Sequence, residues 1–161
     1  MVFLLTFSTY GTHLPGDARG SFDHVRGGHR RFLDPNTAFE RWNRLHSRQA
    51  TFSLATAASR HAVRDAIVEV CTFRSSTLLA LHVRPTHLHG IVNSESPPGA
   101  VVRDWKTYAT RRLRSLGLAA SDQLIWTHSG NAVALQSPET VQAGVRYVLE
   151  AQGEPMACFS A

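Results

Sequence analysis

Two histidines separated by one residue are the sharpest chemical signal in this chain of 161 residues. His87-Leu88-His89 opens an apolar run that predicts a β-strand over 87–93. Side chains two residues apart on a strand point to the same face, so both imidazoles would project side by side while Leu88 enters the core. Neutral imidazole is a good ligand for divalent metals, and the pair therefore predicts half of a metal site. The alternative is two histidines on the solvated face of an edge strand.

A tyrosine in a basic helical segment is the second candidate. Helical periodicity predicts a helix over 101–116, on which Asp104, Tyr108 and Arg112 recur at four-residue spacing and share one flank. A phenol becomes a useful nucleophile when a metal ion or a base assists it. The alternative is an amphipathic tyrosine at the edge of a core.

The elements that must position these residues alternate between strands and helices. Alternating or continuous apolar runs predict strands at 2–9, 77–83, 87–93 and near 131–135. Helical periodicity predicts helices from about Thr56, over 101–116 and from a cap at Ser137, with Pro138 in the first helical position. This order is the split βαβ plan of a ferredoxin-like sheet. We therefore predict an α+β fold, an antiparallel sheet with helices on one face, its other face open to a ligand, and a C-terminal helix.

One domain accounts for residues 1–161, because this length suits a single hydrophobic core. Residues 18–48 are predicted to be an insertion that is polar and irregular as far as residue 36 and then forms a short helix. That helix is inferred from three apolar residues at helical spacing, Phe39, Trp42 and Leu45. Residues 153–161 are predicted to be a tail and a candidate mobile segment.

The charge balance favours a polyanionic partner. The chain has 17 Lys and Arg against 12 Asp and Glu, a formal charge of +5 and a pI of about 10.0. Basic side chains neutralise phosphates and release counterions. No apolar run approaches the ~20 residues of a membrane span, which argues against a membrane protein. Cys71 continues an apolar helical stripe and Cys158 lies in the tail, so no disulfide framework is expected and a cytoplasmic location fits.

Four segments in this order resemble the single-tyrosine HUH transposases of insertion sequences, in particular the REP-associated tyrosine transposases. They are TFSTYGTHLPGD with ARGSFDH behind it, ALHVRPTHLHGIV, WKTYATRRLR, and IWTHSG with VRYVLEAQG. The resemblance spans nearly the whole chain. It implies a ferredoxin-like, nucleoid-associated prokaryotic enzyme that nicks and rejoins single-stranded or hairpin DNA. By position, His87 and His89 would bind Mg²⁺ or Mn²⁺, and Tyr108 would become linked to a 5′-phosphate.

The chain departs from the family pattern at one position. The family usually places an amide or carboxylate ligand four residues after the tyrosine, where this chain has Arg112. Asp104 could supply the missing ligand, metal binding could be weaker, or Arg112 could clamp phosphate in a copy that does not cut. The predicted nickase and strand transferase therefore has an alternative, a domesticated protein that binds structured single-stranded DNA without cleaving it. A homodimer and a monomer both remain open.

Further candidate DNA contacts come from basic residues and from a glycine-containing loop. Gly11 and Gly16 can take positive φ, which lets backbone amides approach phosphate closely; the alternative is a loop that braces the first strand. Trp42 and Trp126 could stack on unpaired bases or belong to the core. The basic candidates, whose alternative is a solvated surface, are Lys106, Arg111, Arg112 and Arg19, with Arg26, Arg30 and Arg31 extending the same charge.

Four remaining residues are weaker candidates, two histidines for the missing metal ligand and two tyrosines that rival Tyr108 as the nucleophile. His13 and His82 are expected to be hydrogen-bonded histidines. Tyr10 precedes the glycine-containing loop and Tyr147 lies within the last helix, and neither matches the nucleophile position of the family.

Overall fold

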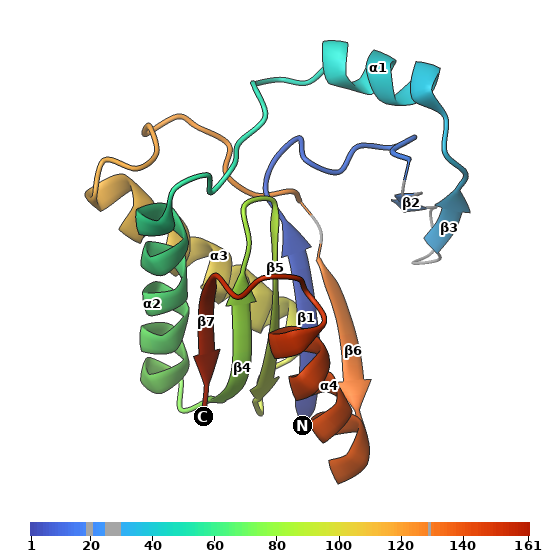
Figure 1. Ribbon diagram of the computed structural model, residues 1–161. Helices are drawn as coiled ribbons and strands as arrows, with labels where there is room; N and C mark the ends of the chain where they lie inside the picture. The colour runs from blue at the N-terminus through green and yellow to red at the C-terminus, as the bar shows by residue number, and fades with distance from the viewer. Residues whose placement is uncertain (19–20, 25–29, 129) are drawn as a thin grey trace.

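The computed structural model describes residues 1–18, 21–24, 30–128 and 130–161 (Figure 1). For residues 21–24, 30 and 31 it describes the backbone alone. Two sheets and four helices make up this part of the chain. In chain order the elements are β1 (Val2–Ser8), β2 (Ser21–His24), β3 (Arg30–Leu33), α1 (Thr37–Leu45), α2 (Ala57–Phe73), β4 (Thr77–Val83), β5 (His87–Asn93), α3 (Pro98–Ser115), β6 (Asn131–Leu135), α4 (Pro138–Glu150) and β7 (Ala157–Ser160).

The main sheet has five antiparallel strands in the order β6-β1-β5-β4-β7. Its first four strands have the order of the predicted ferredoxin-like plan, and the α+β class is confirmed. The central strand β5 pairs with β1 and β4 on its two sides. This register sets Ser8 opposite His87 and places His89 between Thr6 and His82.

Helices cover both faces of this sheet (Figure 1). Leu88 and Val92 of β5 face the large core beneath α2 and α3, together with Trp105 of α3. Ile91 faces the other way, into a smaller core that contains Val148 of α4. Strand alternation therefore directs the odd-numbered residues of β5, including both histidines, to the α4 face.

The helix boundaries have local causes that are visible in the sequence. Thr56 caps α2 through its side chain, and Ser137 forms a capping box with Thr140 at the start of α4. Gly90 is required where β5 meets α3, because a Cβ there would lie 2.8 Å from the Trp105 ring. Among the described residues, no helix combines the length and the apolar character needed to cross a bilayer.

Three expectations about the fold differ from the structure. The closing helix α4 lies on the sheet face that was predicted to be open to a ligand. Residues 157–160, predicted as part of a mobile tail, form β7 and pair with β4, which covers the backbone groups of an otherwise open edge. The predicted irregular segment contains the hairpin β2–β3, whereas the short helix predicted after it is present as α1.

Candidate active site

The histidine pair lies on the α4 face at the start of β5. The ring centroids of His87 and His89 are 5.0 Å apart, with their planes at 81°. His89 is buried, His87 is partly exposed, and Leu88 between them is fully buried in the opposite core. The alternation that predicted two imidazoles on one face is therefore confirmed.

A threonine hydroxyl contacts Nδ1 of each ring. Thr6 Oγ1 lies 2.8 Å from His89 Nδ1, and Thr86 Oγ1 lies 3.0 Å from His87 Nδ1. When these hydroxyls accept from Nδ1–H, each ring adopts the tautomer whose lone pair is on Nε2. Such partners fix the orientation of a metal-ligating histidine. Both rings are thus held by contacts of the kind that orient metal-ligating histidines.

The environment keeps His89 uncharged. Burial lowers the pKa of His89 from its usual 6.5 to about 4, and electrostatic coupling to the neighbouring basic groups of His87, His82 and Arg84 acts in the same direction. A neutral ring at pH 7 retains the lone pair that a cation needs.

His82 is a buried anchor between the sheet and the end of α4. Its Nδ1 lies 3.2 Å from the carbonyl oxygen of Val148, and its Nε2 accepts from the Met156 N–H at 3.2 Å. A single neutral tautomer satisfies both bonds, and burial lowers the pKa of His82 in the same direction. The expected hydrogen-bonded histidine is confirmed, and it fixes the helix residue that follows Tyr147.

Tyr147 is the tyrosine that the fold brings to the histidines. Its ring packs edge-on against His89, with centroids 5.6 Å apart and planes at 80°. The side chain is 44% exposed, so a ligand in solution can reach it. Sequence reasoning passed over this residue. Val141, Val145 and Val148 could have identified it, because this apolar stripe places Tyr147 at the flank of the face that α4 turns to the sheet.

Tyr108 lies on the other side of the sheet. It packs against the α2–α3 core, with its ring centroid 6.3 Å from that of Phe73 and the Arg111 guanidinium 5.7 Å above it. The expected sharing of one site by Tyr108 and the imidazoles is therefore not found within one chain. The reason is that the apolar stripe of α3 packs against α2, and Tyr108 on its flank follows that stripe.

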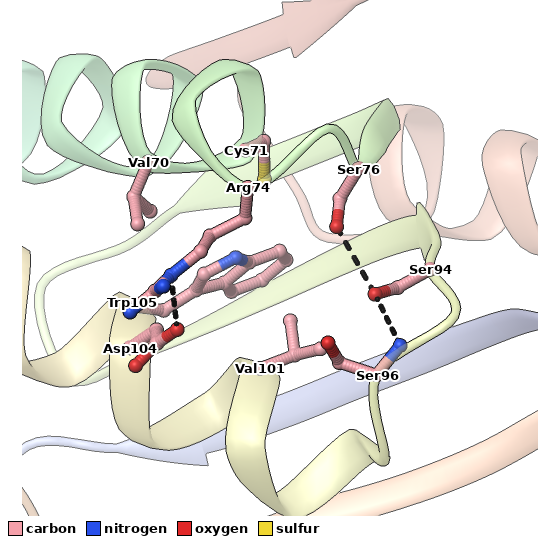
Figure 2. Close-up of a pocket in the computed structure, with 9 residues that line it drawn as sticks. All are labelled: Val70, Cys71, Arg74, Ser76, Ser94, Ser96, Val101, Asp104 and Trp105. Atoms are coloured by element: carbon pink, nitrogen blue, oxygen red, sulfur yellow. Dashed lines mark hydrogen bonds and ion pairs between the residues drawn. The ribbon is translucent and has the colours of Figure 1, made fainter.

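Asp104 and Arg112 also face α2 and not the histidines. Asp104 forms an ion pair with Arg74, with Oδ2 and Nε 2.9 Å apart. Figure 2 shows this pair beside a small pocket lined by Cys71 and Trp105. Arg112 forms an ion pair with Glu69. The structure thus places neither the proposed third ligand nor the arginine that replaces the family ligand next to the histidine pair.

Burial raises the pKa of the Cys71 thiol to about 11, as expected for a buried, inert cysteine.

Known structures share this architecture. The chain matches no protein-family profile and no curated protein. It does superpose on a REP-associated tyrosine transposase bound to a REP hairpin, with TM-score 0.53, 16% identity and 92% of this chain covered. The fold is that of a REP-associated tyrosine transposase. A candidate transposase from Deinococcus radiodurans R1 superposes with TM-score 0.52 and 14% identity over 94% of this chain and 90% of its own. The chain spans 64% of the length of the REP-associated transposase.

In this transposase fold, Lys106 braces a loop. Its ammonium donates to the carbonyl oxygens of Thr127 at 2.8 Å and His128 at 3.3 Å, and it lies 5.1 Å from the Phe7 ring. Burial lowers its pKa to about 8. These contacts join α3 to the loop before β6, which differs from the expected solvent-facing phosphate contact. Arg111 is exposed.

The glycines of the first loop serve packing. Gly11 and Gly16 have φ of 73° and 93°, and a Cβ on them would lie 2.8 Å from Thr51 Oγ1 and 2.5 Å from the Asn36 carbonyl oxygen. These close approaches pack the loop against residue 51 and the start of α1, while a contact with phosphate stays a prediction. Arg19 and Arg26 lie outside the described residues.

The residues on the α4 face fit a divalent cation as two of its ligands. No group of three His, Cys, Asp or Glu side chains that could hold a metal occurs in the described part of the chain. Mg²⁺ commonly takes few protein ligands and completes its shell with water and substrate phosphate oxygens. His87 and His89 match that mode in the number of protein ligands, although their imidazole nitrogens replace the carboxylate oxygens that Mg²⁺ prefers, and DNA phosphate would supply the further oxygen ligands.

Proposed function

We propose that this protein is a DNA nickase and strand transferase that acts on single-stranded or hairpin DNA through a covalent 5′-phosphotyrosine at Tyr147. The observation that supports this proposal is the placement of Tyr147 against His89, with His87 on the same face of the sheet. An exposed phenol beside a pair of imidazoles is a candidate nucleophile next to two candidate metal ligands.

His87 and His89 would hold Mg²⁺ or Mn²⁺, which when bound polarises the scissile phosphate and stabilises charge on its oxygens. The Tyr147 oxygen attacks phosphorus as the bond to the 3′-oxygen breaks. The phenol loses its proton and the departing 3′-oxygen gains one, so the products are a 5′-phosphotyrosine and a free 3′-hydroxyl. The new ester retains the energy of the broken bond, so a 3′-hydroxyl can reverse the step and rejoin DNA without ATP.

Positioning in this reaction comes from residues that hold the histidines and the end of α4 in place. Thr6 and Thr86 orient the two imidazoles, and His82 fixes the C-terminal turn of α4 directly after Tyr147. Holding a nucleophile in attack geometry lowers the entropic part of the barrier.

The choice of DNA as ligand rests on charge and on the structural neighbour. The chain carries a net charge of +5, and the REP-associated transposase of similar fold is described in complex with a REP hairpin. A non-cleaving binder of structured DNA is the second candidate. It is favoured by the finding that the described residues bring no third His, Cys, Asp or Glu to the histidine pair.

The test is incubation of the full chain with end-labelled hairpin oligonucleotides that carry single-stranded flanks, with Mg²⁺ or Mn²⁺, followed by denaturing electrophoresis. We expect an adduct for the wild type and for Tyr108→Phe, and no adduct for Tyr147→Phe. Hairpin binding without an adduct under any of these conditions would establish the non-cleaving binder instead. An adduct that persists in Tyr147→Phe and disappears in Tyr108→Phe would assign the nucleophile to Tyr108.

A further inference from the structure

Helix α1 presents an aromatic face to solvent. All of α1 is described, and none of its residues is buried. Trp42 is 54% exposed, Phe39 42% and Leu45 74%, at the three-residue spacing of one helix face. A contiguous exposed apolar face of this kind marks a binding surface more often than scattered single residues do.

The rings on this face form a short column. The Trp42 indole lies 4.2 Å from the His46 ring with planes at 25°, and 6.4 Å from the Phe39 ring with planes at 11°. Near-parallel, exposed rings are what an unpaired nucleobase stacks on, because every base has a π-face.

Hydrogen bonds hold α1 at the end of the sheet where the histidine pair lies. The Asn36 N–H, at the N-cap of α1, donates to the Gly16 carbonyl at 2.9 Å, and Asn43 Nδ2 donates to the Pro15 carbonyl at 3.2 Å. The start of the same loop is bonded to β5, since Thr12 Oγ1 donates to the Thr86 carbonyl at 3.1 Å, directly before His87.

The chain after α1 returns to the same place. The Leu54 N–H donates to the Pro85 carbonyl at 2.8 Å, two residues before His87. Figure 1 shows α1 beyond the end of the sheet at which β1 finishes and β5 begins. A single strand of DNA that runs from the histidine pair along this end of the molecule would meet α1.

The charges on α1 favour nucleic acid over a second copy of this chain. The helix carries Arg41 and Arg44 against one acidic residue, Glu40, which pairs with Arg44 at 2.6 Å, and Arg48 follows three residues after its end. Aromatic rings among arginines suit a strand whose bases stack while its phosphates meet the cations. A symmetric contact between two α1 helices would bring like charges together.

We propose that the face of α1 formed by Phe39, Trp42 and His46 is a base-stacking site for unpaired nucleotides of single-stranded DNA. The choice of ligand rests on the proposed function, whereas the site itself lies outside the cutting centre. It anchors the single-stranded flank while the scissile phosphate occupies the face of the sheet that carries His87 and His89.

The test measures DNA binding in the Tyr147→Phe background, which separates binding from cutting. The probe is a fluorescein-labelled oligothymidylate of about 20 nucleotides, long enough to span several stacking positions. We expect Trp42→Ala to weaken binding about tenfold, with Trp42→Phe close to the parent because a ring is retained. Phe73→Ala, which removes an aromatic ring 67% exposed at the end of α2, is the matched control and should leave affinity unchanged.

Tryptophan emission and photocrosslinking locate the contact. Of the three tryptophans, Trp105 is 1% exposed and Trp126 donates through its indole to the Lys106 carbonyl, so quenching by DNA should disappear in Trp42→Phe. An oligonucleotide carrying 5-iododeoxyuridine should crosslink to a peptide that contains Trp42. Circular dichroism should show an unchanged fold for Trp42→Ala, because the side chain is outside the core.

Several results would overturn the proposal. Equal oligothymidylate affinity for the parent and Trp42→Ala would remove the stacking site. If Trp42→Ala instead converts a dimer to a monomer in sedimentation at unchanged DNA affinity, the face is a contact between copies of this chain. A wild type that forms the Tyr147 adduct while Trp42→Ala binds normally refutes this site alone. A wild type that binds neither oligothymidylate nor hairpins refutes the proposed function with it.

Discussion

The two faces of the sheet use the same strand for different purposes. On the α2–α3 face, β5 supplies Leu88 and Val92 to a large core around Trp105. On the α4 face it supplies one apolar residue, Ile91, to a small core, and then His89 and His87. One face therefore stabilises the fold, while the other holds polar groups on a rigid support. The face of the sheet that a helix covers therefore decides whether a tyrosine on that helix lies beside the histidines, as Tyr147 does, or against the large core, as Tyr108 does.

Removing Trp105 tests the stabilising role of the α2–α3 face and has the largest expected effect. The side chain is 1% exposed and fills the space above Gly90. Trp105→Ala should lower the free energy of unfolding by about 3–5 kcal/mol, because it leaves a large cavity. The measurement is urea denaturation followed by circular dichroism. Val148→Ala, in the smaller core under α4, is the comparison and should cost less.

Replacing either histidine of the pair tests the chemical role of the α4 face. His87→Ala and His89→Ala should each slow adduct formation about 100-fold, as expected when a metal ligand is lost. Single-turnover kinetics across a Mn²⁺ titration measure this. His61→Ala, an exposed histidine on α2, is the control. Equal rates for His89→Ala and His61→Ala would mean that the pair does not bind the reacting centre.

Replacing His82 tests whether adduct formation depends on how firmly the end of α4 is held against the sheet. His82→Phe keeps a planar aromatic ring but leaves the Val148 carbonyl and the Met156 N–H without their bonds. We expect about a tenfold slower rate of adduct formation at unchanged DNA affinity, because Tyr147 is held less firmly. A change in affinity with no change in rate would contradict this positioning role.

The smallest expected effect is a pH dependence of the free energy of unfolding that comes from His89 on the α4 face. The pKa of His89 is about 4 in the folded chain and near 6.5 when unfolded, so the unfolded state takes up the proton first. Its contribution is fully present above about pH 6.5 and is lost as the pH falls from there toward about 4. Urea denaturation of the metal-free chain should show a shallower loss for His89→Gln over this range. Parallel curves for the two proteins would contradict the lowered pKa.

The sequence predicted most elements because their signals are local. Alternation identified β5 and the shared face of His87 and His89, and capping residues marked the start of α4. The resemblance to the REP-associated transposases is confirmed for the fold. These inferences needed only the spacing of apolar residues along the chain and its short sequence motifs.

The positions of the two tyrosines could not be predicted in the same way. Tyr108 and Tyr147 each lie on the flank of an amphipathic helix, and which face of the sheet a helix covers depends on pairing between distant strands. β7 was missed for a related reason, since four residues carry little periodicity and their partner β4 lies far away in sequence. The predicted placement of Asp104 and Arg112 beside the histidines was wrong for the same reason, because they lie on the same helix as Tyr108.

The central claim is that the α4 face, through Tyr147, performs the chemistry. The direct measurement is mass spectrometry of the protein–DNA adduct after nuclease and protease digestion. The account predicts a phosphonucleotide on the peptide that contains Tyr147, and none on the peptide that contains Tyr108. A modified Tyr108, with Tyr147 unmodified, would contradict it.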